Sequence, residues 1–171
     1  MIEPLKESLW TQFAASIDML KNAITAWPEE NWETNKRFFY MAYHTLVFLD
    51  YYLTIPYKSF TSPLPFTFTE PANMPADAID DVIPNRIYSK TELLKYVHTS
   101  REKCRLVIEG LTEEKLNERW VEDFEGGMDY PVLEILLYNM RHVQHHAAQL
   151  NLLLRQRTNY GPGWVARAED E

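Results

Sequence analysis

Four segments of the chain carry apolar residues at intervals of three and four, and this helical spacing limits most strongly how the chain can fold. The first segment runs from Leu5 to about Ala26, and its spaced apolar residues are Leu9, Phe13, Ile17, Leu20 and Ile24. The second runs from about Lys36 to Ile55, where Pro56 stops it. Both segments are predicted to form helices with one apolar face.

A third helix is predicted from Ser89 to Gly110. Ser89 is followed three residues later by Glu92, which is the pattern of a capping box at a helix start. The acidic run Thr112-Glu113-Glu114 then predicts a short extra helix before the last long one.

The fourth long helix is predicted to extend to about Gln156, with Asp129 as its cap and Pro131 in its first turn. Residues 56–84 hold six of the ten prolines, lack a helical period and contain little that would pair as strand. They are predicted to form a long ordered loop or lid. The tail, residues 159–171, is expected to lie over the helices or to remain mobile.

These elements predict an all-α protein. The expected architecture is a four-helix bundle with a long Pro-rich connection after helix two and a short extra helix before helix four. The 171 residues contain no internal repeat and no sign of a second domain, so residues 1–171 are expected to form one domain with its own core.

Charge and hydropathy exclude several classes of partner. The net charge of −8 would repel a phosphate backbone, and no cluster of lysine and arginine offsets it, so no nucleic-acid partner is expected. No stretch approaches the ~20 apolar residues that a membrane-spanning helix needs. The first residues are acidic where a signal peptide would be basic, which predicts a cytoplasmic protein.

Cys104 is the only cysteine, which excludes an internal disulfide and a zinc site built on several thiolates. It stands at helical spacing from apolar neighbours such as Val97 and Val107. This pattern is typical of a small buried core residue and not of a catalytic thiol.

Three histidines form the pattern that points to chemistry. His142 and His146 are one turn apart on the fourth helix, about 40° from each other, so their imidazoles can reach the same point. His44 lies in the middle of the apolar face of the second helix, where an unpartnered ring nitrogen costs about 1–3 kcal/mol. A core histidine bonded to a tyrosine or a backbone carbonyl is the alternative for His44.

Together the three imidazoles would supply the protein ligands of an open metal site. Neutral imidazole suits zinc, nickel, cobalt and iron, so the ligand set alone does not choose the metal. The chain has neither the Glu-x-x-His pairs of di-iron bundles nor the His-Glu-x-x-His motif of zinc proteases.

These residues resemble a known family. The chain is similar to the DinB/YfiT-like superfamily of metal-binding four-helix bundles in Tyr43-His44 and in His142-Val143-Gln144-His145-His146-Ala147-Ala148-Gln149-Leu150. The resemblance implies that His44, His142 and His146 bind one divalent metal ion, with nickel or zinc expected. It also implies a homodimer.

Five further residues are candidates for a supporting role. Asn139 and Gln149 lie beside His142 and His146 on the fourth helix, and they are expected to hold a ligand ring or a bound water. The alternative is that they are ordinary polar residues at the border of the apolar face. Tyr40 and Tyr51 flank His44 and could donate hydrogen bonds, with aromatic core packing as the alternative. His145 points away from the ligand pair and is expected to support the site, to donate to a neighbouring helix or to face a subunit interface.

His98 stands on a mostly outer face of the third helix, so a solvated side chain is expected there and not a ligand. The resemblance implies a metal-dependent enzyme, which is expected to activate a low-molecular-weight thiol for transfer. A metal-dependent hydrolase is the alternative within the same class, and a non-enzymatic metal-binding stress-response protein is the alternative from another class.

Overall fold

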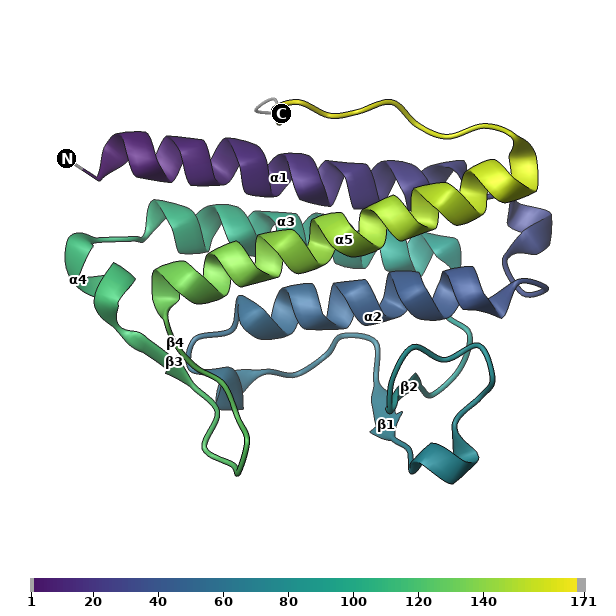
Figure 1. Ribbon diagram of the computed structural model, residues 1–171, viewed down its shortest axis with the longest axis horizontal. Helices are drawn as coiled ribbons and strands as arrows, with labels where there is room; N and C mark the ends of the chain where they lie inside the picture. Colours follow the sequence, from purple (N-terminus) through teal and green to yellow (C-terminus); the bar gives the residue numbers. More distant parts are fainter. Residues whose placement is uncertain (1, 169–171) are drawn as a thin grey trace.

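The computed structural model describes residues 2–168, and most of them are helical (Figure 1). The α-helices are α1 (Glu3–Ala26), α2 (Lys36–Tyr52), α3 (Lys90–Glu109), α4 (Glu113–Asn117) and α5 (Val132–Thr158). Three short 3-10 turns cover Glu29–Asn31, Tyr57–Ser59 and Pro71–Asn73. No helix within residues 2–168 combines the length and the apolarity needed to cross a membrane.

The four long helices pack side by side. Helices α1 and α2 each contact both α3 and α5, as the parallel ribbons of Figure 1 show. The apolar residues predicted to share one face of α1, such as Phe13, Ile17 and Leu20, are fully buried. Cys104 is also fully buried, as predicted, and burial raises the pKa of its thiol. The helical spacing in the sequence therefore identified the core.

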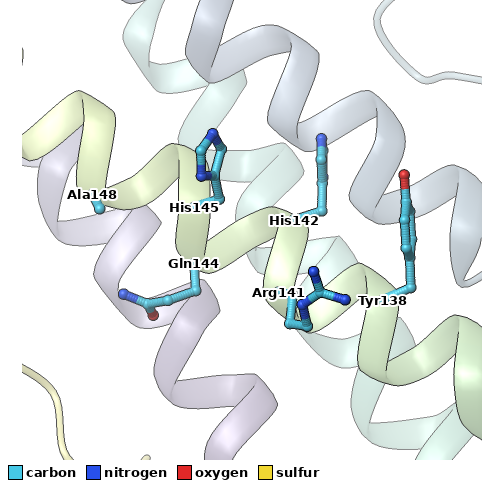
Figure 2. A pocket seen from close by; sticks show the side chains of 6 residues that line it. All are labelled: Tyr138, Arg141, His142, Gln144, His145 and Ala148. Carbon is cyan, nitrogen blue, oxygen red and sulfur yellow. The ribbon is translucent and has the colours of Figure 1, made fainter.

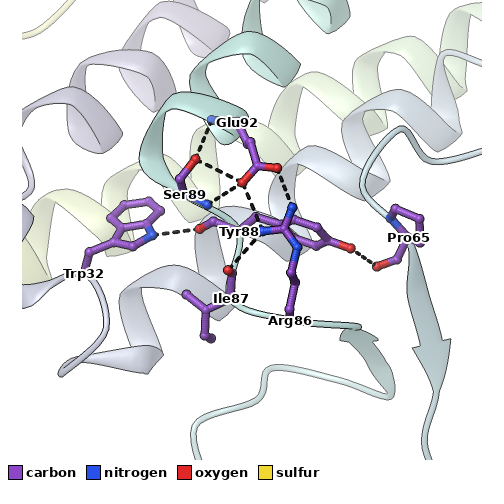
Figure 3. Close-up of polar contacts among 7 residues, drawn as sticks. All are labelled: Trp32, Pro65, Arg86, Ile87, Tyr88, Ser89 and Glu92. Carbon is purple, nitrogen blue, oxygen red and sulfur yellow. Dashed lines mark hydrogen bonds and ion pairs between the residues drawn. The ribbon is translucent and has the colours of Figure 1, made fainter.

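Helix α3 begins with the predicted capping box (Figure 3). The hydroxyl of Ser89 accepts a hydrogen bond from the backbone N–H of Glu92, and the Glu92 carboxylate accepts one from the backbone N–H of Ser89 at 2.8 Å. Arg86 binds the same carboxylate with an Nη2–Oε1 distance of 2.6 Å. The guanidinium and the Ser89 hydrogen bonds hold the pKa of Glu92 at about 2, so the box is charged at neutral pH.

The start of helix α5 differs from the prediction. Residues Asp129–Pro131 form strand β4, which pairs antiparallel with β3 (Arg119–Val121), and the helix begins only at Val132. Asp129 does not cap the helix because its carboxylate accepts from Arg119 Nε at 2.7 Å across the strand pair. The backbone N–H of Val132 donates instead to the carbonyl of Glu118 at 2.8 Å.

The Pro-rich segment 56–84 is ordered, as predicted, but it contains a strand pair where the sequence showed little that would pair as strand. Strand β1 (Phe66–Phe68) pairs antiparallel with β2 (Val82–Pro84). With β3 and β4, this makes two small sheets, so the fold is mostly helical and not strictly all-α. Three residues per strand are too few to give a recognisable alternation of apolar and polar side chains.

Side chains from the helical core hold this Pro-rich segment in place. The hydroxyl of Tyr43 in α2 donates to the carbonyl of Leu64 at 2.5 Å. The hydroxyl of Tyr88 donates to the carbonyl of Pro65 at 2.6 Å (Figure 3). The Tyr88 carbonyl in turn accepts from the indole N–H of Trp32 at 2.8 Å. The segment is therefore fixed against the face of α2 that carries His44.

The described part of the tail, residues 159–168, runs back along α1 (Figure 1). Gln12 donates to the carbonyl of Ala166 at 3.1 Å, and the N–H of Ala168 donates to the carbonyl of Thr11 at 3.1 Å. Of the two alternatives predicted for the tail, these residues follow the first. Residues 169–171 lie outside the described residues.

Candidate metal centre

Helices α2 and α5 bring the three predicted histidines together. One ring nitrogen from each of His44, His142 and His146 lies within 4.8 Å of the other two. The Nε2 atoms of His44 and His142 are 3.0 Å apart, and the ring centroids of His142 and His146 are 4.6 Å apart. Both distances follow from the packing of α2 against α5 and from the one-turn spacing on α5.

The cluster is part-buried and has an aromatic wall. The Phe48 ring lies 4.8 Å from the His44 ring and 5.9 Å from the His142 ring, between centroids. Burial lowers the pKa of His142 to about 3 and that of His146 to about 4, and the nearby His44 ring adds to both effects. Both imidazoles are therefore neutral at pH 7, with a lone pair that can bind a cation.

Asp80 fixes the orientation of His44 from the Pro-rich segment. Its Oδ2 atom is 2.8 Å from His44 Nδ1, and its Oδ1 atom accepts the backbone N–H of Val82 at 3.1 Å. An ionised carboxylate only accepts hydrogen bonds, so the proton of His44 is on Nδ1 and the lone pair of Nε2 faces the other two rings. Carboxylates commonly hold metal-binding histidines in this way.

Asp80 is a site residue that sequence reasoning missed. It belongs to no motif, and it lies in the predicted loop or lid, to which no role in the site was assigned. The only signal in the sequence is an acidic residue in a loop that follows the helix with His44, and many loops share that feature.

Gln149 orients the third ring. The Nδ1 atom of His146 is 2.7 Å from Gln149 Oε1, so this N–H donates to the amide oxygen and leaves Nε2 free. Gln149 thus contacts a candidate ligand, at the place where the sequence suggested it.

The hydrogen bonds around His142 test whether a cation fits. His44 Nε2 is an acceptor, so the 3.0 Å contact requires His142 Nε2 to donate its proton. Its Nδ1 is then a bare lone pair, buried and without a partner among the described residues. A shared cation can replace the Nε2–Nε2 hydrogen bond, because each of the three rings then offers one nitrogen lone pair to the ion and keeps its single proton on the other nitrogen. Nitrogens bound to a tetrahedral zinc lie roughly 3.3 Å apart, within the range seen here. The donor set therefore fits a divalent ion.

Three of the predicted supporting residues have other contacts. Asn139 is fully buried, and its side chain donates to the carbonyl of Leu49 at 2.9 Å, which joins α5 to α2. Tyr51 donates to Glu122 Oε1 at 2.6 Å, and the Tyr40 ring packs against Phe39. Within residues 2–168, none of the three forms a hydrogen bond with the histidine cluster.

The other two histidines lie outside the cluster. His145 is exposed, with its ring centroid 5.1 Å from that of His146. His98 is exposed on α3, as the sequence indicated. Neither contributes to the group of ring nitrogens that could hold an ion.

The sequence was compared with models of known protein families. The model of the DinB family matches residues 1–158. The chain belongs to the DinB family. The DinB match spans all five α-helices and all three histidines of the cluster, and it ends at the last residue of α5. A search of curated proteins and a search of solved structures found no match.

Proposed function

We propose that this DinB protein binds one divalent metal ion, nickel or zinc, through His44, His142 and His146, and that it activates a low-molecular-weight thiol for transfer to an electrophile. The observation that carries the proposal is the number of ligands. Among residues 2–168, no further histidine, cysteine or carboxylate joins the cluster. Three protein ligands with an open position are typical of catalytic sites, whereas structural zinc sites are closed by four.

Neutral ligands also favour this chemistry. An ion held by three imidazoles keeps its positive charge largely uncompensated, and it would lower the pKa of a coordinated thiol towards neutrality. In the transfer, the thiol gives its proton to solvent and its sulfur forms a bond to an electrophilic carbon. The leaving group departs with the bonding electron pair. Asp80 and Gln149 keep the His44 and His146 rings oriented throughout.

Hydrolysis is the second candidate, with water in place of the thiol, and a non-enzymatic role in the stress response is the third. Cys104, the only thiol in the sequence, is fully buried on α3 and is not in the histidine cluster. The reaction therefore depends on which small molecule takes the open position.

We further propose a cytoplasmic homodimer built on a four-helix bundle, without a nucleic-acid or membrane partner. The pairwise packing of α1, α2, α3 and α5 supports the bundle. The net charge of −8 argues against nucleic acid.

Cobalt substitution tests the thiol proposal directly. Cobalt-loaded protein is titrated with glutathione, cysteine and bacillithiol, and a sulfur-to-cobalt charge-transfer band is expected on addition. The same thiols should react faster with an added electrophile when the metal is present. If no band and no rate increase occur across the panel, thiol transfer is wrong, and assays of hydrolysis would then separate the two remaining functions.

A further inference from the structure

A shallow pocket lies over α5 next to the histidine cluster (Figure 2). Its volume is about 540 Å³, which is enough for a small metabolite. Its lining residues are Tyr138, Arg141, His142, Gln144, His145 and Ala148. His142 is common to the pocket and to the cluster, so a molecule in the pocket lies next to the proposed metal ion.

Arg141 is the charged residue of this pocket. It is exposed, and it forms no hydrogen bond or ion pair with any of residues 2–168. Six other arginines bind a carboxylate or an amide oxygen: Arg86, Arg101, Arg105, Arg119, Arg157 and Arg167. Arg37 and Arg155 also form no side-chain hydrogen bond or ion pair within residues 2–168, but neither lines this pocket. The Arg141 guanidinium therefore keeps its full donor capacity for a ligand.

The rest of the lining favours an anion. Figure 2 shows Gln144 and Arg141 extending from one side of α5, with Tyr138, His142 and His145 on the other. Amide, phenol and imidazole groups all offer N–H or O–H donors, and no acidic side chain lines the pocket. An acid-free pocket is notable in a chain with 25 acidic and 17 basic residues.

We infer that this pocket binds the carboxylate of the substrate through Arg141, and that the substrate class is a small carboxylate-bearing thiol. The inference rests on the proposed function, in which the thiol of the substrate binds the metal ion. It adds that the carboxylate of the same substrate binds Arg141. A guanidinium binds a carboxylate with two parallel hydrogen bonds, so it also fixes the direction in which the ligand lies. Arg141 and His142 both line this pocket, so one molecule in it can contact both side chains.

The test compares two thiols that differ in one charge. N-acetylcysteine carries a carboxylate, and N-acetylcysteine amide is neutral. Dissociation constants of both are measured by the absorption titration of cobalt-loaded wild type, Arg141→Gln and Arg155→Gln. The ratio of the two constants is then compared between proteins, because the intrinsic difference between the thiols is the same in each protein and cancels in that comparison. We expect the preference for N-acetylcysteine to fall about five- to tenfold in Arg141→Gln.

Arg155→Gln is the matched control, because Arg155 is exposed on the same helix and does not line the pocket. Its ratio should equal that of wild type. An unchanged ratio in Arg141→Gln, with the band intact, overturns the inference and leaves the proposed function standing. Loss of metal from Arg141→Gln also overturns it, because the residue would then act on the metal site. Absence of a band in wild type overturns the proposed function and the inference with it.

Discussion

At the scale of single residues, the site depends on partners that hold each imidazole in one orientation. His44 donates to Asp80 and His146 donates to Gln149, so two of the three rings present Nε2 to the centre. The sequence could indicate Gln149, because it is three residues from His146 on the same helix. It could not indicate Asp80, because that contact depends on how the Pro-rich segment folds back on α2.

The substitution Asp80→Asn tests this role. The amide keeps the size of the side chain but loses the charge that fixes the His44 tautomer, so we expect metal affinity to fall about 10- to 100-fold. Competition with a chromophoric chelator measures the dissociation constant. The control is Asp81→Asn, because Asp81 is exposed and does not contact the cluster. Equal affinities in both variants and wild type would show that Asp80 does not support the site.

The pH dependence of the metal-free protein is a second prediction. The pKa values of His142 and His146, about 3 and about 4, lie below the value of about 6.5 in an unfolded chain. Between these limits the unfolded state binds more protons, so the free energy of unfolding falls as the pH drops from about 6.5 towards 4. Urea unfolding at pH 7.5 and pH 5 measures this loss.

The variant His142→Gln isolates the contribution of that ring from those of the carboxylates. It should lose less stability than wild type between the two pH values, because it has one group fewer that takes up a proton on unfolding. A pH dependence equal to that of wild type would mean that His142 is not held neutral by burial.

At the scale of elements, the sequence was informative where a pattern extends over several turns. The apolar spacing of α1 and the capping box of α3 were both predicted and are both present. The sequence was uninformative where three-residue strands pair, as in β1 with β2 and β3 with β4. Asp129 is an example. It is a residue type that often caps a helix, but here its carboxylate accepts a hydrogen bond from Arg119 in the neighbouring strand.

The capping box gives a prediction at this scale. In Ser89→Ala, the N–H of Glu92 loses its acceptor, and we expect a loss of about 1 kcal/mol in the free energy of unfolding. Thr91→Ala is the control, because Thr91 is exposed inside the first turn and does not cap the helix. Chemical unfolding of both variants and of wild type measures the free energy of unfolding. A Ser89→Ala protein as stable as Thr91→Ala would contradict the assigned cap.

At the scale of the whole molecule, the core lies between the long helices and does not include the three histidines. The largest fully buried side chains include Phe13, Phe38 and Leu46, from α1 and α2. The histidine cluster is at the edge of this core and is only part-buried. The sequence predicted the cluster because helical periodicity places His142 with His146 and turns His44 inward. The residues that contact the cluster from outside the two helices could be identified only from the folded structure.

Removal of the metal should therefore leave the protein folded. The buried core should supply net stability of the usual ~5–15 kcal/mol, and losing a ligand held at 1,000 times its dissociation constant costs about 4 kcal/mol. Circular dichroism with and without a chelator at pH 7.5 should show the same helix content and a lower melting temperature. Loss of the helical signal on chelation would mean that the ion is structural, which would remove the main support for an enzyme.

The most direct test of the central claim is the metal content of protein purified without an affinity tag. Wild type should contain about one divalent ion per chain, since three imidazoles converge on one point. His44→Ala, His142→Ala and His146→Ala should each lose the ion, whereas His98→Ala should keep it because that side chain is exposed on α3. Full metal retention in His44→Ala would contradict the three-histidine site.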